Sequence, residues 1–181
     1  ISEGEVQQLI NAKTPAVSEQ DYLTVIHKKT AALFEAACRT GAVLAGAAEE
    51  QKEAAWLFGH HLGLAFQLID DLLDYEGDQA ALGKNIGDDL AEGKPTLPLI
   101  HAMAHTEGAE QELIRDAITN GRVDHLADIV ALIRRCGSLD YTRRKAQEHA
   151  HKAELALGAL PDNSWRKAME ELARFSVTRA Y

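Results

Sequence analysis

The apolar residues of this chain recur mainly at intervals of three and four, the spacing that places side chains on one face of an α-helix. The spacing is already present at Val6, Leu9 and Ile10. No run alternates in β-branched residues as a half-buried strand does. The pattern predicts an all-α fold, one helical domain over residues 1–181. The expected helices span residues 4–13, 21–47, 49–75, 97–105, 109–120, 123–136, 139–160 and 164–178.

The two longest expected helices differ in how their apolar stripes are built. Ser18 is the expected N-cap before residues 21–47. Gly41 and Gly46 leave one face of that helix without side chains at two positions. We expect another helix to approach closely at these glycines. The stripe of residues 49–75 is continuous, which predicts that this face is packed in the core.

Composition narrows the classes of function. The chain has 181 residues, 46% of them hydrophobic, and a formal net charge of -9. An acidic chain of this size fits one domain with a real core and argues against nucleic acid or an anionic membrane as partner. Cys38 and Cys136 are far apart and lack the spacing of a zinc site or a disulfide framework, which fits a reducing, cytoplasmic setting. No apolar run predicts a membrane anchor.

One stretch of the second long helix, FQLIDDLLD, sets three aspartates among apolar residues. On a helix, Asp70, Asp71 and Asp74 fall on the same side as Gln67, so they are expected to form an acidic wall facing a cavity or solvent. Like charges at this spacing repel, and a divalent cation reverses that penalty. Mg²⁺ is the expected ion, because it takes oxygen ligands and binds through few carboxylates.

A solvated acidic face is the alternative for such a helix taken alone. The long segment of residues 77–98 then favours the metal site. It contains GKNIGDDLAEGKPTLPL, which supplies Lys84 and Lys94 just beyond the wall, with Asp88 and Asp89 between them. A segment this long without an expected helix is disordered or functional, and lysines beside a metal site suit a diphosphate.

Two further polar groups interrupt the helices. HKKTA, residues 27–31, breaks the apolar pattern of the first long helix, and from composition alone it is a surface turn of that helix. His60 and His61 are adjacent and point about 100° apart on a helix, so they do not easily share a metal. They are interpreted as ordinary polar or packing positions.

KTA, FQLIDDLLD and GKNIGDDLAEGKPTLPLI, in this order and at this spacing, resemble the trans-isoprenyl (polyprenyl) diphosphate synthases. The resemblance extends over essentially the whole chain. It implies an isoprenoid synthase helical bundle, usually a homodimer, that condenses an allylic diphosphate with isopentenyl diphosphate under Mg²⁺. The implied chemistry is ionisation of the allylic diphosphate, attack by the isopentenyl double bond and loss of a proton. The implied product is a long-chain trans-polyprenyl diphosphate, octaprenyl for a quinone side chain.

The resemblance also implies roles for individual residues. Asp70, Asp71 and Asp74 correspond to the second aspartate-rich motif of the family and are expected to contact metal, Asp70 and Asp74 first. Lys29 corresponds to a lysine that contacts the allylic diphosphate. The implied catalytic residues are Lys29, Thr30 and Gln67, and the implied diphosphate-binding residues are Lys29, Lys84 and Lys94. Thr30 is expected near the developing cation, and Gln67 with its amide oxygen toward positive charge.

One feature of the family is missing from this sequence. The first aspartate-rich motif and the basic residues for isopentenyl diphosphate are not found in residues 1–181. The chain is therefore expected to be a C-terminal portion that does not catalyse alone. Two other interpretations stay open: a noncatalytic helical subunit of a heteromeric prenyl synthase, and a class I terpene cyclase.

Overall fold

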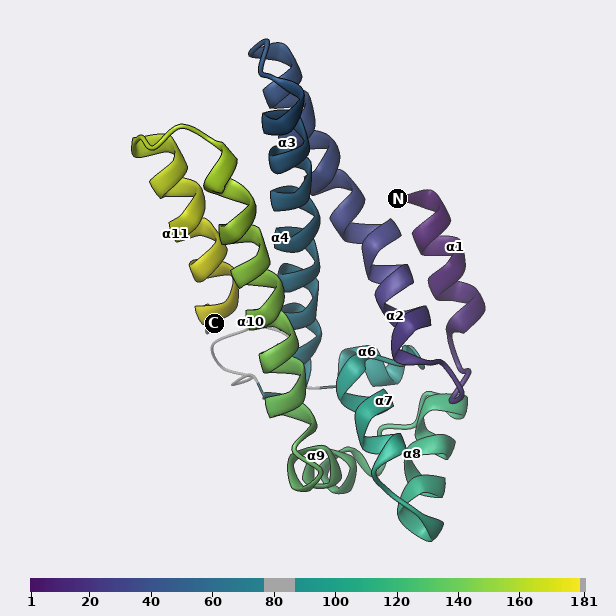
Figure 1. The fold of residues 1–181 in the computed structure, drawn as a ribbon. Coiled ribbons are helices and arrows are strands. Elements are labelled where there is room, and N and C mark those ends of the chain that lie inside the picture. Colours follow the sequence, from purple (N-terminus) through teal and green to yellow (C-terminus); the bar gives the residue numbers. More distant parts are fainter. Residues whose placement is uncertain (77–86, 180–181) are drawn as a thin grey trace.

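The computed structural model describes residues 1–76 and 87–179, and every regular element in these ranges is helical (Figure 1). The prediction of an all-α chain is confirmed. The elements are α1 (Ser2–Asn11), α2 (Glu19–Ile26), the π-helical turn η1 (His27–Ala31), α3 (Ala32–Leu44), α4 (Glu49–Glu76), α6 (Asp88–Ala91), α7 (Leu97–Ala104), α8 (Gly108–Asn120), α9 (Leu126–Arg135), α10 (Ser138–Ala156), the 3₁₀ turn η2 (Leu157–Ala159) and α11 (Ser164–Thr178).

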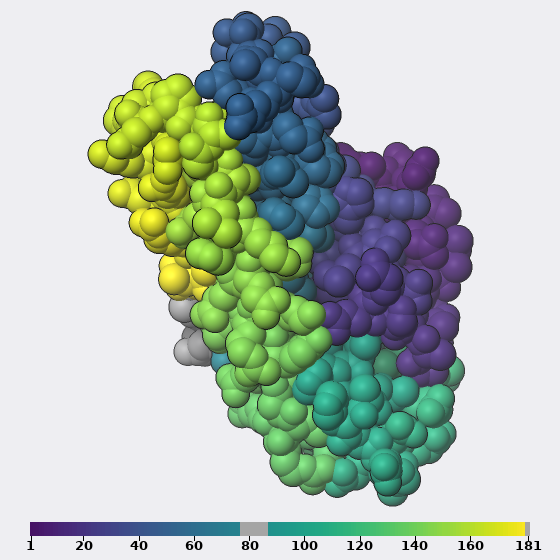
Figure 2. Space-filling model, viewed as in Figure 1, coloured from purple at the N-terminus to yellow at the C-terminus, as the bar shows by residue number. Residues whose placement is uncertain are grey.

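Helix α4 is the axis of the fold. Its 28 residues give it a length of about 42 Å, and it packs along α3 on one side and α10 on another. Helices α10 and α11 form one flank of the molecule and α1 and α2 the other, while α6 to α9 gather at one end (Figures 1 and 2). Within the described residues, none of the helices combines the length and apolar character needed to cross a membrane.

The same helix supplies side chains to three successive core clusters. Phe58 packs with residues of α10, η2 and α11, Leu68 with residues of α2 and α7, and Tyr75 with residues of α7, α8 and α9. Each of these side chains is at most 2% exposed. Burial of a large apolar side chain contributes roughly 1.5–3 kcal/mol, so α4 is fixed along its whole length. Polar groups on it are therefore held on a rigid support.

The expected helix of residues 21–47 is in fact three consecutive segments. The N-cap at Ser18 is confirmed, as a capping box in which Ser18 and Asp21 bond each other's backbone N–H. Residues 27–31 are not an ordinary surface turn of an α-helix but the π-helical turn η1. The polar run HKKTA interrupts the apolar pattern here, but this interruption does not distinguish a π-helical turn from a surface turn of an α-helix. π-Helical turns occur often at functional sites.

The predicted close approach at Gly41 and Gly46 is wrong. A Cβ added at either position has no neighbour within 4 Å, and Gly46 ends its helix with a left-handed φ of +66°. The close approaches lie on α4 instead. A Cβ on Gly59 would stand 2.5 Å from the Phe34 carbonyl oxygen, and one on Gly63 would stand 2.5 Å from the Cα of Ala31. The expected close approach of a neighbouring helix thus occurs at glycines of α4 rather than at Gly41 and Gly46.

The expected helix-free segment of residues 77–98 contains the short helix α6, Asp88–Ala91. Gly87, with a left-handed φ of +84°, precedes it, and its N–H donates to the Asp74 carbonyl oxygen at 3.0 Å. The chain thus returns to the C-terminal end of α4 immediately before α6. The helix of residues 164–178 was predicted with its observed bounds.

Candidate active site

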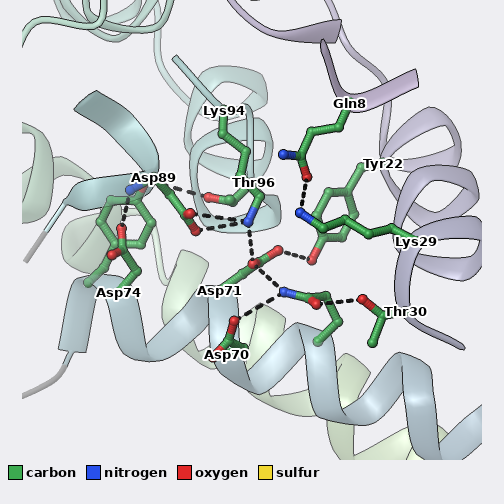
Figure 3. Close-up of polar contacts among 12 residues, drawn as sticks. Gln8, Tyr22, Lys29, Thr30, Asp70, Asp71, Asp74, Asp89, Lys94 and Thr96 are labelled. Carbon is green, nitrogen blue, oxygen red and sulfur yellow. Dashed lines mark hydrogen bonds and ion pairs between the residues drawn. The ribbon is translucent and has the colours of Figure 1, made fainter. Parts of the chain in front are cut away.

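The three aspartates near the end of α4 do not share one environment. Asp71 is fully buried, whereas Asp70 and Asp74 are partly exposed. The sequence predicted a single wall facing a cavity or solvent. In the structure Asp70 and Asp74 keep part of their surface exposed. Asp71 instead points toward Tyr22 and Lys94 (Figure 3).

Both carboxylate oxygens of Asp71 are occupied by protein donors. The Tyr22 hydroxyl donates to Oδ2 at 2.7 Å, and the amide of Gln67 and the ammonium of Lys94 each donate to Oδ1 at 2.9 Å. These donors come from α2, from one turn earlier on α4, and from the segment after α6. A buried carboxylate needs such partners, since burying an unpaired charge costs several kcal/mol. Asp71 therefore joins three separate segments at one point.

Lys94 connects Asp71 to a second carboxylate. Its Nζ lies 3.1 Å from Oδ2 of Asp89, and its side chain is only 14% exposed. Burial disfavours the charged form of Lys94, but the attraction of Asp71 and Asp89 outweighs it and raises the pKa above its ordinary value. Burial and repulsion from Asp71 raise the pKa of Asp89. The ammonium is thus fixed in position and in charge.

Asp74 lies beside these residues, and fewer hydrogen-bond donors offset the burial of its carboxylate. It accepts the backbone N–H of Asp89 at 3.3 Å. Burial, with repulsion from Asp88 and Asp71, raises its pKa to about 6 despite that hydrogen bond and the nearby Lys94. A carboxylate that is hard to ionise in the protein alone is one that an added cation can stabilise.

Thr30 and Gln67 join the π-helical turn to α4. The Thr30 hydroxyl donates to Oε1 of Gln67 at 2.8 Å, and Nε2 of Gln67 donates to Asp71 and, at 3.3 Å, to Asp70. The two helices can approach this closely because Gly63 faces the backbone of Ala31. The Gln67 amide is therefore oriented with its oxygen toward η1 and its nitrogen toward the aspartates.

Lys29 lies at the edge of the same group of residues (Figure 3). Its Nζ donates to Oε1 of Gln8 at 3.0 Å and lies 3.3 Å from a carboxylate oxygen of Glu5, both on α1. Gly4 permits the contact between α1 and η1, because a Cβ there would stand 2.4 Å from the Lys29 backbone nitrogen. Lys84, the other predicted lysine, lies outside the described residues.

Sequence reasoning missed Tyr22 and Gln8, and it named Asp89 without giving it a role. Tyr22 belongs to an apolar stripe, and its partner Asp71 is 49 residues away, so no local pattern marks the contact. Asp89 is five residues before Lys94, and this spacing was visible in GDDLAEGK. What the sequence lacked was the turn that brings both residues back to α4.

The arrangement brings together oxygen ligands and ammonium groups. Asp70 and Asp74 are accessible carboxylates on one helix, Lys94 is a fixed buried cation, and Lys29 is a partly buried one. Carboxylates of this kind hold a hard divalent cation, and ammonium groups beside it attract a phosphate-bearing ligand. The helical bundle is that of the expected isoprenoid synthase fold, and these residues are the candidates for its metal and diphosphate site.

The sequence profile described as Polyprenyl synthetase matches residues 1–133, and the chain belongs to that family. The expected resemblance is confirmed. Over 180 residues the chain is 50% identical to octaprenyl diphosphate synthase of Escherichia coli (strain K12), and the alignment covers 99% of this chain and 56% of that protein. It is 48% identical over 182 residues to octaprenyl diphosphate synthase of Haemophilus influenzae, covering 100% of this chain and 55% of that protein.

Solved structures agree. Polyprenyl synthase of Caulobacter crescentus CB15, complexed with calcium and isoprenyl diphosphate, matches with a TM-score of 0.93 and 45% identity over 99% of this chain and 56% of that one. Decaprenyl diphosphate synthase of Rhodobacter capsulatus matches with a TM-score of 0.92 and 42% identity, again over 99% and 56%. The chain thus spans little more than half the length of these relatives.

Proposed function

We propose that this chain carries the diphosphate-binding and metal-binding part of a trans-polyprenyl diphosphate synthase, which adds isopentenyl diphosphate units to an allylic diphosphate. The observation that carries the proposal is the joining of Asp71, Lys94, Gln67 and Thr30 in one buried network, with Asp70 and Asp74 left accessible beside it. A merely solvated acidic face would not build such a network.

Asp70 and Asp74 are the residues that fit a divalent cation best. Both oxygens of Asp71 already have protein donors, so Asp71 supports the site from behind and contacts metal less readily. Mg²⁺ fits the oxygen-only donor set, and so does the calcium of the Caulobacter crescentus complex. The cation, when bound, neutralises charge that builds up on the departing diphosphate.

The protein groups contribute binding and orientation. Lys94 presents a permanently charged ammonium to the diphosphate, since Asp71 and Asp89 hold it in place. Lys29 contacts the same substrate once its ion pair with Glu5 is exchanged. The Thr30 and Gln67 oxygens lie at the π-helical turn, where they stabilise positive charge that develops on the allylic carbon. Lys84, which lies outside the described residues, is proposed to contact the diphosphate as well.

We extend the proposal to product and assembly. Octaprenyl diphosphate is the proposed product, supported by two octaprenyl synthases at 50% and 48% identity. A homodimer and a cytoplasmic location are proposed with it. Reversed-phase chromatography of the dephosphorylated product checks chain length, and light scattering after size exclusion checks the dimer.

The test is incorporation of labelled isopentenyl diphosphate with an allylic diphosphate and Mg²⁺. We expect no incorporation by residues 1–181 alone, and incorporation when the upstream part found in the relatives is supplied. D70N and D74N should each lower the rate at least a hundredfold. The exposed D162N is the matched control and should leave it unchanged.

Two outcomes decide against the proposal. Undiminished incorporation by D70N combined with D74N contradicts the assigned metal site. Conversion of the allylic diphosphate into cyclic hydrocarbon without isopentenyl diphosphate identifies a cyclase instead. Incorporation by residues 1–181 alone contradicts the need for the upstream part, while leaving the site assignment in place.

A further inference from the structure

A second polar cluster lies nearer the N-terminal end of α4. Nδ1 of His60 is 2.7 Å from Oε1 of Glu35, and Nε2 of His27 is 2.8 Å from the same oxygen. All three ligand atoms lie within 4.8 Å of one another. His27 begins η1, Glu35 belongs to α3 and His60 to α4, so the cluster joins three elements. The interpretation of His60 as an ordinary packing position does not account for this convergence.

The cluster is held by its surroundings. Glu35 is only 8% exposed. The indole of Trp56 stacks on the His60 ring at 5.4 Å and 19° between planes. Gly59 lets the α3 backbone come close, since a Cβ there would stand 2.9 Å from the Cα of Glu35. The donor atoms are therefore positioned by packing before any ligand binds.

Hydrogen bonding leaves part of the cluster unsatisfied. His60 is within hydrogen-bond geometry of Glu35, whereas Nε2 of His27 is buried and makes no hydrogen bond in the described structure despite its 2.8 Å distance from the carboxylate. A buried nitrogen that lies near a carboxylate but makes no well-directed hydrogen bond to it is only partly compensated for its loss of water. A ligand that accepts a lone pair from that nitrogen and also meets the carboxylate removes the cost.

We propose that His27, Glu35 and His60 form a binding site for a transition-metal ion of the zinc class. Two imidazole nitrogens and one carboxylate oxygen are a known zinc donor set that leaves a fourth position for water. Tetrahedral ligands about 2.0–2.1 Å from zinc are about 3.3 Å apart. The two nitrogen–oxygen spacings of 2.8 and 2.7 Å therefore open by about 0.6 Å, and the nitrogen–nitrogen spacing, which is within 4.8 Å, adjusts with them through side-chain rotation. The histidines are 39% and 24% exposed, which gives the ion a path in.

This site is chemically distinct from the acidic one. Mg²⁺ takes oxygen ligands and does not select imidazole, whereas zinc, cobalt and nickel do. The bound ion links α4 to η1, the turn that also carries Lys29 and Thr30. It therefore stabilises the position of that turn on α4.

The test is titration of the metal-stripped protein with Zn²⁺ by calorimetry and with Co²⁺ by its visible absorption. We expect one ion per chain at this site and a change in Trp56 fluorescence. H27Q and H60Q should each weaken binding at least tenfold, and E35Q should do the same while keeping a similar side-chain shape. The exposed H151Q is the matched control and should bind as the unaltered protein does.

Further variants locate the ion. D70N combined with D74N should keep the Zn²⁺ site, which separates it from the acidic one. His61 and His149 form the competing pair, with their Nδ1 atoms 3.1 Å apart. Binding that survives H27Q and H60Q but is lost in H149Q overturns the assignment. Absence of Zn²⁺ and Co²⁺ binding in a protein whose circular dichroism shows it folded also overturns it, and the cluster is then a hydrogen-bonded triad only.

Discussion

Two turns of α4, about ten residues or 15 Å apart, bury polar side chains in opposite ways. At one, Nζ of Lys94 lies 2.9 Å from Oδ1 of Asp71 in an ion pair. At the other, His61 packs against His149, and the pKa of each is lowered to about 4, first by burial and then by neighbouring positive charge. The carboxylate turn thus receives a counter-ion, Lys94, from another segment, whereas the partner that reaches the imidazole turn from α10 is a second imidazole.

The comparison shows what the rest of the fold contributes to each turn. The hydrogen bonds of the carboxylate turn use donors from α2, η1 and the segment after α6, so they form only when the whole bundle is folded. The His61–His149 contact depends on the packing of α10 on α4. Substitutions should therefore be more damaging at the first turn than at the second.

The largest effect is expected from K94M. Removal of the ammonium leaves the buried Asp71 and the partly buried Asp89 without their cation, at a cost of about 3–5 kcal/mol in the free energy of unfolding. Urea denaturation measures this loss, and K167M, at an exposed lysine of α11, is the control with the same change of side chain. Equal stability of K94M and K167M would falsify the assignment of Lys94 as the buried counter-ion.

A smaller loss is expected from G63A. The new Cβ meets the Ala31 backbone 2.5 Å away, and separating η1 from α4 should cost about 2–3 kcal/mol and weaken the Thr30–Gln67 hydrogen bond. G41A is the control, because its Cβ has open space and alanine is the better helix former by about 0.5–1 kcal/mol. The midpoint temperature of thermal unfolding should fall for G63A and rise for G41A. A shift in the same direction for both variants contradicts the observed glycine contacts.

Y22F tests one donor of the carboxylate turn. Loss of the hydroxyl removes a 2.7 Å hydrogen bond to Asp71 but leaves its other two donors, so we expect a loss of about 1.5 kcal/mol. Y141F is the control, since Tyr141 donates to Glu19 in a more exposed pair. Urea midpoints compare the two variants, and a larger loss in Y141F would show that burial of the acceptor does not decide the cost.

The sequence predicted more of the helices than of the contacts between them. Apolar spacing gave the bounds of α7 and α11 closely, and the three motifs gave the candidate residues and the family. The π-helical turn was missed because the polar residues that interrupt the apolar pattern at 27–31 are equally compatible with a surface turn of an α-helix. The sequence did not predict that Asp71 is buried while Asp70 and Asp74 are partly exposed, because its partners Tyr22 and Lys94 approach from distant segments. Contacts of this kind depend on the fold, and no single helix encodes them.

The smallest effects concern pH and should have opposite signs at the two turns. The histidine pKa values lie below their ordinary 6.5, so the unfolded chain binds more protons and stability falls as pH drops from 6.5 toward 4. Asp74 has a pKa raised to about 6, so the folded protein binds more protons there and stability falls as pH rises from about 4 to 6.

Urea midpoints at pH 5 and 7, with chelator present, separate the two contributions. H149Q should reduce the loss of stability between pH 7 and pH 5 by about 1 kcal/mol, since the histidine pair is partly exposed. D74N should increase that loss by a similar or smaller amount. A change of the same sign in both variants would mean that the charge states of the two turns are not set by their separate surroundings.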